Sequence, residues 1–565
     1  MNTRRIFSSL AVIGLAVLPV AAVAQQVPVA AVEQQVPVAA ITQQQTDPML
    51  VAMQQEMERS RQKLVLPGML RPYFMEYRLE DVTEYQADAS FGALTNETEN
   101  HQRFVRVQVR VGSYKSDNSS TRGEGTVQVA PMDQNPEALR YALWFATDEA
   151  YKAALNAYSR KQADLKRFET TPTADDFSPA KPVTKIEPLV KLDLDREDWK
   201  QRVVEASGLY AIDPRVKGFA EQIQYSNSSV RGLAVNRYLV NTDGTAVRRG
   251  YTAYSAGISV GTQAPDGTRL SRDNGPVAAQ AKDLESAAVF KQRVIDDLLS
   301  LRGLQKAPVV MAEDYHGPVL FSGDASTDVL NRLFVPNIEA DKPDPGTLAR
   351  TQGAFSSSWK QRVLPDFLDV KDDPGMKTFH GKSLIGSYDI DDEGVPAQTV
   401  QVVSKGILQN YLIDREPVKD FPESNGHGRA ALGRRAESHA GVMIFTPTKV
   451  TPAAEMEKKI LAMAKEQNRP FVYIAETMGG ELTPRLLYRV TPDGKRELVR
   501  GAVFDELDQR SLRSDIIAAG DDPYIQNSLA PLPQTTIAPS LLFGDIAVKR
   551  AQNEQQKLPY YPPPQ

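Results

Sequence analysis

The sequence predicts an α+β protein in which large antiparallel sheets are packed by helices. Apolar and polar residues alternate from Phe104 to Val111, which is typical of a strand with one buried face. Turn sequences at 241–244 and 266–267 join further strand-like runs into a meander. Helical periodicity occurs in separate stretches rather than after every strand, which favours α+β over a regular βαβ alternation.

Two regions of the N-terminal half are expected to lie at the surface. Arg106 and Arg110 lie opposite the valines of the strand at 104–111, so we expect them to face solvent. Residues 170–188 are rich in proline and polar residues, which favours a surface excursion. Helices are expected near 47–64, 135–167 and 281–301.

The C-terminal half is predicted to form a second domain that begins near Ala307. Short apolar runs in this half are expected to be strands, at 308–311, 318–321, 384–390, 397–403, 408–413, 471–475 and 485–490. A helix is expected from about 454 to 465, and Ser326-Thr327-Asp328 is typical of an N-cap and first helical turn. The predicted boundaries are therefore an N-terminal α+β domain at 48–305 and a C-terminal domain at 306–550.

The first residues predict export. Arg4 and Arg5 precede an apolar run, and Ala22-Val23-Ala24 has the small-x-small pattern that signal peptidases cut. We therefore expect a signal peptide at 1–24 and a mature protein in the periplasm or outside the cell. Residues 25–47 contain a near-repeat of Q-Q-V-P-V-A-A and are expected to be a disordered leader, and 551–565 a Pro-rich tail.

Composition excludes several classes of site and partner. The 565 residues include no cysteine, so disulfides, thiolate nucleophiles and Cys-containing zinc sites are excluded. The formal net charge is −5 and no long basic stretch occurs, which argues against nucleic acid as a partner. The apolar run near the N-terminus is shorter than the ~20 residues that a membrane span needs, and no later run approaches that length.

A group of motifs in the C-terminal half resembles the TldD/PmbA family. These motifs are Asp391-Asp392-Glu393-Gly394-Val395-Pro396-Ala397-Gln398, then Gly406-Ile407-Leu408, then Asn425-Gly426-His427-Gly428-Arg429. The resemblance extends over about 50–550 and is specific in the C-terminal half. It implies a two-domain architecture and a homodimer or heterodimer. Active members of this family are zinc peptidases that accept peptides in an enclosed cavity and carry H-E-x-x-x-H on a helix after an apolar strand.

This chain departs from the family at the zinc motif. The motif would follow the apolar run at 318–321, where Ser322, Gly323 and Thr327 stand in place of its two histidines and its glutamate. Active members also use a late cysteine, which this chain lacks. No cofactor is therefore expected, and zinc only if a partner subunit supplies it. No two of the five histidines have the spacing of a helical metal site.

Two loops supply the remaining candidate site residues. His427 and Arg429 are flanked by glycines that allow close backbone approach, so they are candidates to face a substrate; the alternative is a turn with a solvated histidine. Asp391, Asp392 and Glu393, near Asp389, could hold a hard cation through oxygen ligands; a solvated turn explains them equally well.

Three functions are compatible with these residues. The first is a non-catalytic, PmbA-like component of a peptide-processing metallopeptidase assembly, paired with a motif-bearing TldD-type subunit. The second is an active exported peptidase or hydrolase that uses a non-standard site at His427, Arg429 and residues 391–393. The third is a periplasmic binding or scaffold protein, since a fold does not fix a function. Whether the chain is an enzyme stays open.

Overall fold

The computed structural model describes residues 47–119, 125–168, 173–311, 315–343 and 349–551. The predicted signal peptide, almost all of the leader and most of the Pro-rich tail lie outside these residues. In the N-terminal part, the strands form one eight-stranded sheet with the order β3-β2-β1-β5-β6-β4, and β7 and β8 also pair with β6. The strands are β1 (Phe74–Ser90), β2 (Ala93–Arg110), β3 (Thr126–Val129), β4 (Thr184–Ile186), β5 (Ile223–Asn241), β6 (Ala246–Gln263), β7 (Arg269–Asn274) and β8 (Val277–Ala278).

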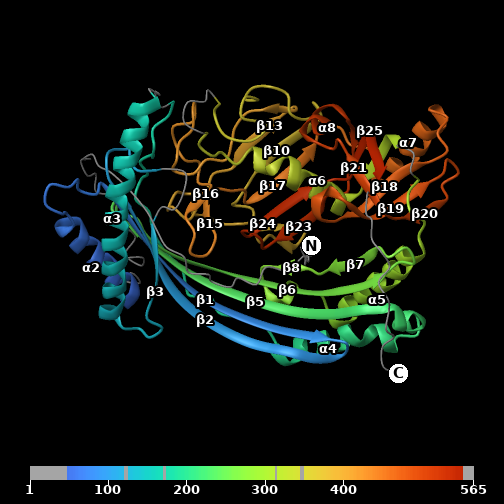
Figure 1. The fold of residues 1–565 in the computed structure, drawn as a ribbon, viewed down its shortest axis with the longest axis horizontal. Helices are drawn as coiled ribbons and strands as arrows, with labels where there is room; N and C mark the ends of the chain where they lie inside the picture. The colour runs from blue at the N-terminus through green and yellow to red at the C-terminus, as the bar shows by residue number, and fades with distance from the viewer. Residues whose placement is uncertain (1–46, 120–124, 169–172, 312–314, 344–348, 552–565) are drawn as a thin grey trace.

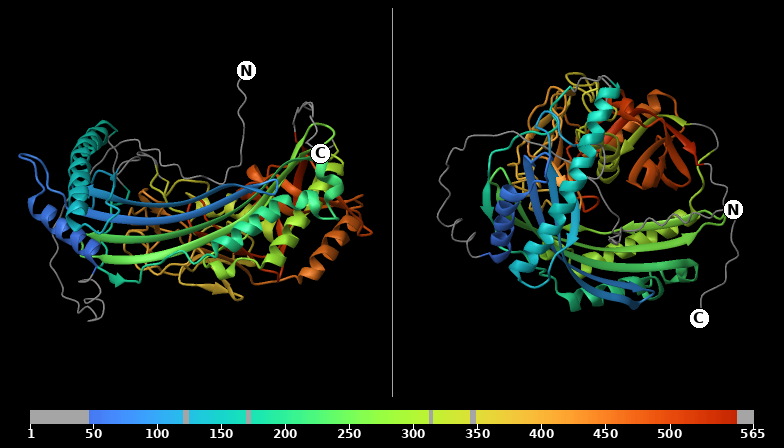
Figure 2. Two further views of the ribbon diagram at one scale, coloured as in Figure 1. Left: turned by 90° about the horizontal axis from the view of Figure 1, so that it is seen from below. Right: turned by 60° about the vertical axis from the view of Figure 1, so that its left-hand side comes forward.

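The four long strands β2, β1, β5 and β6 form a curved antiparallel surface whose outer face is covered by helices (Figures 1 and 2). These helices are α2 (Pro48–Lys63) and α3 (Pro136–Phe168) at one end, and α4 (Arg196–Ile212) and α5 (Ala287–Lys306) at the other. Side chains alternate between the two faces of a strand. Tyr77 and Leu79 of β1 therefore pack with α2 and α3, and Tyr85 and Ala87 with α4 and α5. On the other face of β1, Arg78 donates to the carbonyl of Arg434 and Glu80 accepts from the backbone N–H of Gly433, so this face lies against the C-terminal part.

The C-terminal part contains two sheets with α6 (Gly323–Leu333) between them. One sheet has the order β14-β13-β10-β17-β24-β23, and the other has the order β20-β19-β18-β9-β25-β21, with β22 also on β25. Helix α6 contacts β18 of one sheet and β23 and β24 of the other, while α7 (Ala453–Glu466) packs on β9 and β18. The strands are β9 (Tyr315–Phe321), β10 (Leu368–Asp372), β13 (Val400–Ser404), β14 (Ile407–Leu408), β17 (Val442–Pro447), β18 (Val472–Met478), β19 (Pro484–Val490), β20 (Arg496–Val499), β21 (Ala502–Asp505), β22 (Ile516–Ala519), β23 (Tyr524–Ser528), β24 (Gln534–Ala538) and β25 (Leu541–Arg550).

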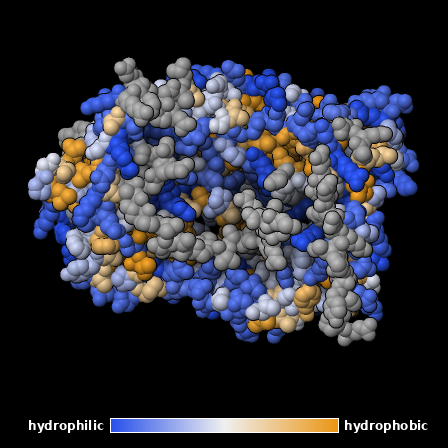
Figure 3. Space-filling model, viewed as in Figure 1, coloured by the Kyte–Doolittle hydropathy of each residue, from blue (hydrophilic) through white to orange (hydrophobic). Residues whose placement is uncertain are grey.

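The C-terminal part lies over the concave face of the curved sheet (Figure 1). Short hairpins, β11 (Thr378–Phe379) with β12 (Lys382–Ser383) and β15 (Gly428–Ala430) with β16 (Ala436–Ser438), and a short helix α8 (Gln509–Ser514) complete it. Apolar side chains gather at the α2–α3 end of the face drawn in Figure 3. Leu66 and Met69, which follow α2 in the chain, are exposed. No described helix is long and apolar enough to cross a lipid bilayer.

The predicted α+β class is confirmed, and several elements match their sequence signals. The helix near 47 begins with Asp47 as N-cap, whose carboxylate accepts from the backbone N–H groups of Met49 and Leu50. The helices from Pro136 and Ala453 and the turn between β5 and β6 also lie where they were expected. The strand expected at 384–390 is wrong, since only an isolated bridge at Ile390 forms there. The helix expected at 281–301 is α5, which begins later, at Ala287.

Two surface predictions are wrong. Arg106 and Arg110 are buried because the face of β2 that carries them is covered by the C-terminal part; Arg110 pairs with Asp117 at 2.7 Å and with Glu416 at 2.9 Å. The Pro-rich stretch is not a surface excursion throughout. Its residue Ser178 is buried, and the backbone carbonyl of Ser178 accepts from the guanidinium of Arg415 at 2.8 and 3.0 Å.

Candidate functional site

The positions assigned to the zinc motif lie at the start of α6. Ser322 is the N-cap residue and Gly323 the first helical residue, so the N-cap expected at Ser326 is wrong and Ser326 and Thr327 lie inside the helix. The Ser322 hydroxyl lies 3.3 Å from the carbonyl of Ala475, and the buried Thr327 hydroxyl donates to the carbonyl of Asp324 at 2.8 Å. Both hydroxyls are therefore engaged by backbone carbonyls.

The space beside Gly323 is already filled. A Cβ atom built on Gly323 would lie 2.6 Å from the Cβ of Tyr524, which is closer than real side chains approach. A glutamate at this position would therefore collide with β23. With two engaged hydroxyls and no side chain at 323, these residues do not fit a zinc ion, which needs histidine, cysteine or carboxylate ligands. Within the described ranges, no group of three or more His, Cys, Asp or Glu side chains is arranged to hold a metal.

Asp391 organises the acidic turn from within. Its carboxylate accepts from the backbone N–H groups of Glu393 (3.0 Å), Val395 (2.8 Å) and Gly428 (2.9 Å). The side chain is 1% exposed, and burial raises its pKa above the ordinary value. Gly394 closes the turn with φ +81°, and a Cβ there would meet Thr245 of the β5–β6 turn at 2.8 Å. The turn is thus built to lie against the sheet.

Asp392 joins the turn to the curved sheet through two arginines. Its carboxylate pairs with Arg237 of β5 at 2.5 Å and with Arg249 of β6, and it also accepts from the backbone N–H of Ala430 at 2.8 Å. Burial works against the charge, but Arg237 and then Arg249 hold the pKa of Asp392 far below its usual range. This carboxylate is therefore ionised and fully engaged.

Glu393 completes the same contact. Its carboxylate accepts from the backbone N–H of Arg415 at 2.7 Å, and burial, followed by the charges of Asp414 and Asp391, raises its pKa. The three acidic residues 391–393 are all buried, so the alternative of a solvated turn is wrong. Their oxygens bind backbone N–H groups and arginines of this chain, which leaves the cation-site hypothesis without support from the geometry.

His427 is completely buried behind Tyr388. Its Nδ1 lies 2.9 Å from the side-chain oxygen of Asn425, and its Nε2 lies 3.6 Å from Asp372. The alternative of a solvated histidine is therefore wrong. His427 packs edge-on against the ring of Tyr388, whose hydroxyl donates to the carbonyl of Gly426 at 3.0 Å. Because His427 has no exposed surface, it does not reach the adjoining cavity.

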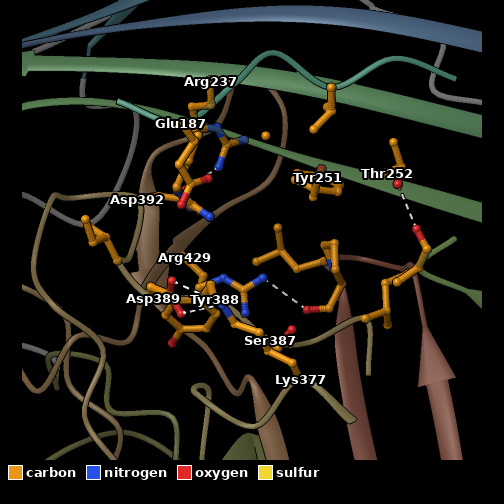
Figure 4. A pocket seen from close by; sticks show the side chains of 18 of the residues that line it. Glu187, Arg237, Tyr251, Thr252, Lys377, Ser387, Tyr388, Asp389, Asp392 and Arg429 are labelled. Atoms are coloured by element: carbon orange, nitrogen blue, oxygen red, sulfur yellow. Dashed lines mark hydrogen bonds and ion pairs between the residues drawn. The ribbon is translucent and has the colours of Figure 1, made fainter. Parts of the chain in front are cut away.

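Arg429 lines a cavity of about 280 Å³ between the curved sheet and the C-terminal part (Figure 4). Its guanidinium lies 4.3 Å above the ring of Tyr388 and donates to the carbonyls of Ala440 and Pro533, at 3.3 and 3.1 Å. Further polar lining residues come from both parts of the chain: Lys185, Glu187, Arg237, Arg249, Tyr251, Thr252, Gln280, Lys377, Ser387, Asp389 and Asp392. The sequence alone did not indicate the residues that β6 contributes, because they are distant in the chain from the motifs.

Comparisons with known proteins agree with this fold. Residues 314–550 match the profile of the PmbA/TldA metallopeptidase C-terminal domain. A protein named metalloprotease PmbA homolog from Buchnera aphidicola is 22% identical over 190 residues, which cover 32% of this chain and 40% of that relative. The aligned region thus spans less than half of the relative's length.

Two solved structures share the fold over most of the chain. A modulator-of-DNA-gyrase protein from Thermotoga maritima superposes with a TM-score of 0.60 at 16% identity, covering 88% of this chain and 99% of that one. TldE from Thermococcus kodakarensis superposes with a TM-score of 0.56 at 12% identity, again covering 88% and 99%. The fold and the C-terminal profile define a metallopeptidase-related class of protein. The C-terminal part of the chain, residues 314–550, belongs to the PmbA/TldD family.

Proposed function

We propose that this chain is an exported, non-catalytic, PmbA-like component of a peptide-processing metallopeptidase assembly. The observation that carries the proposal is the start of α6, where the hydroxyls of Ser322 and Thr327 bind backbone carbonyls and Tyr524 fills the space beside Gly323. A chain without metal ligands at this point needs a second subunit to supply zinc chemistry. We infer that this subunit is a TldD-type protein that carries H-E-x-x-x-H and is exported to the same compartment.

The test compares the chain alone with the chain plus such a partner. Zinc per chain is measured by elemental analysis, and cleavage of a mixed peptide library by mass spectrometry. We expect no stoichiometric zinc and no cleavage by the chain alone, and cleavage above the partner's own level in the mixture. The matched control is the chain mixed with a partner whose motif glutamate is replaced by glutamine. This mixture should cleave no peptide. Bound zinc with cleavage by the isolated chain would contradict the proposal.

The two alternative functions, a hydrolase and a binding protein, differ in how far the geometry supports them. The hydrolase with a site at His427 has no support, because that histidine has no exposed surface and the carboxylates at 391–393 are engaged by the protein. The binding-protein alternative is favoured by one specific observation, the cavity that Arg429 lines. A binding role is compatible with a non-catalytic subunit.

A further inference from the structure

The cavity between the curved sheet and the C-terminal part has a cationic lining. Its charged residues are five cations, Lys185, Arg237, Arg249, Lys377 and Arg429, and three acids, Glu187, Asp389 and Asp392. Each acid is held by one or more of the cations: Asp392 by Arg237 and Arg249, and both Asp389 and Glu187 by Lys185. Arg237 pairs in addition with the buried Glu80, which does not line the cavity. Arg429, by contrast, has no carboxylate within ion-pair distance in the described part of the chain.

Two guanidinium N–H groups in this lining have unused hydrogen-bonding capacity. Arg429 and Arg237 are 6% and 5% exposed, and the Nε atom of each lacks a partner among the described residues. Buried donors in proteins are almost always paired, so these two arginines keep hydrogen-bonding capacity next to the cavity that the described residues do not use. Tyr251 extends from β6 into the same space (Figure 4), and its pKa is raised chiefly by burial, so its hydroxyl stays a neutral donor.

Another part of the lining is apolar and limits the kind of anion. Leu384, Ile385, Ile390, Leu532 and Pro533 line the cavity beside the arginines and the two tyrosines. A small, strongly hydrated anion such as phosphate gains nothing from such walls, whereas an organic acid buries its apolar portion against them. Guanidinium groups match the planar carboxylate with paired N–H donors. At about 280 Å³ the cavity lies just below the usual size of small-molecule sites and suits a ligand of about one amino-acid residue.

We propose that this cavity binds a small organic monocarboxylate with an apolar portion, held by Arg429 and Arg237 and by the Tyr251 hydroxyl. The carboxylate lies toward the arginines and the apolar portion lies against Leu384, Ile385 and Leu532. Lys185 and Lys377 at the rim attract the anion and remain paired with Asp389. Such a carboxylate has two sources, a free acid or the end of a longer chain, and both present the same group to the arginines.

The test is calorimetric titration of the full-length chain with N-acetyl-leucine, N-acetyl-leucinamide, acetate and inorganic phosphate. We expect N-acetyl-leucine to bind about tenfold or more tightly than its amide, because only the acid carries the negative charge that makes charge-assisted hydrogen bonds to the arginines. Acetate and phosphate should bind more weakly than N-acetyl-leucine. Equal affinity for acid and amide, phosphate binding as tight as the acid, or no binding of N-acetyl-leucine at all would overturn the proposal.

Variants locate the binding. R429Q keeps donors for the two backbone carbonyls but removes the charge, and should weaken binding about tenfold. If R429Q does not fold, K377E serves instead, because the Lys377 side chain is 68% exposed and its replacement should weaken binding a few-fold through charge alone. The matched control K495E changes an exposed lysine on the β19–β20 turn and should leave the affinity unchanged. Unchanged affinity in K377E and in any folded R429Q would overturn the assignment to this cavity.

A longer ligand distinguishes the two sources. N-acetyl-Ala-Ala-Leu that binds at least as tightly as N-acetyl-leucine would support the end of a longer chain, and its exclusion would support a free small acid. All titrations use the chain alone. Their result is therefore independent of the partner-dependent cleavage by which the proposed function is tested.

Discussion

The start of α6 and the cavity beside Arg429 both carry polar side chains of the C-terminal part. They differ in whether those side chains already have hydrogen-bond partners within the protein. At α6 the hydroxyls of Ser322 and Thr327 bind backbone carbonyls, and Tyr524 fills the adjoining space. At the cavity, two buried arginines keep an N–H group without an acceptor. The difference teaches that a polar residue is available to a ligand only where the protein leaves its hydrogen-bonding capacity unused.

The largest effect is expected at Asp392, which holds two arginines of the curved sheet. Asp392→Asn would leave Arg237 and Arg249 buried without their counter-charge, and we expect a loss of about 3–5 kcal/mol in unfolding free energy. Urea denaturation of both proteins measures it. A loss below about 1 kcal/mol would show that the turn does not fasten the two parts together.

A smaller loss is expected when a glutamate is introduced at the start of α6. Gly323→Glu places a side chain against Tyr524, and overpacking of this kind costs about 1–3 kcal/mol. Thermal unfolding measures the loss, and elemental analysis checks that the variant gains no zinc. Gly218→Ala is the matched control, since a Cβ there meets nothing within 4 Å. Wild-type stability in Gly323→Glu would mean that the space beside 323 is open.

The contribution of Asp324 on α6 to the stability of the fold depends on pH. Burial, followed by the charge of Asp328, raises the pKa of Asp324 from 3.8 to about 6. A raised pKa means that the folded state holds the proton more tightly, so this contribution to stability is full below about pH 4 and is lost as the pH rises through 6.

Asparagine at 324 does not titrate. Relative to wild type, Asp324→Asn should therefore gain about 2 kcal/mol of stability between pH 4 and pH 7, a value reduced from the full shift because the side chain is only partly buried. Unfolding free energies at both pH values measure the gain. A stability difference between the two proteins that does not change with pH would contradict the assigned direction.

The smallest effect is expected at the rim of the cavity. Asp389 pairs with Lys185 at 2.7 Å and with Lys377 at 3.3 Å, but its side chain is 40% exposed. Exposed ion pairs contribute little, so Asp389→Asn should change the unfolding free energy by less than about 1 kcal/mol. The same denaturation series as for Asp392 checks it. A loss as large as that of Asp392→Asn would show that rim and turn form one buried network.

Several elements were predictable because their signals are local. The N-cap Asp47, the proline at the start of α3 and the turn after β5 each lie within a few residues of what they determine. Helix α4 was missed because its sequence is rich in charged residues and includes Gly208. That glycine allows the helix to cross the β1–β2 turn closely, since a Cβ there would lie 3.1 Å from Gly92. Such a contact between distant segments has no local signal.

The sequence by itself determined the α+β class, the family and the residue types at 322, 323 and 327, which cannot bind zinc whatever surrounds them. Only the tertiary structure decided that residues 391–393 and His427 are buried and that Arg429 meets Arg237 and Tyr251 at one cavity. The physical reason is that the periodicity of apolar residues identifies the two faces of a strand or helix. Which face is covered depends on packing between segments hundreds of residues apart, as Arg110 on β2 shows by pairing with Glu416.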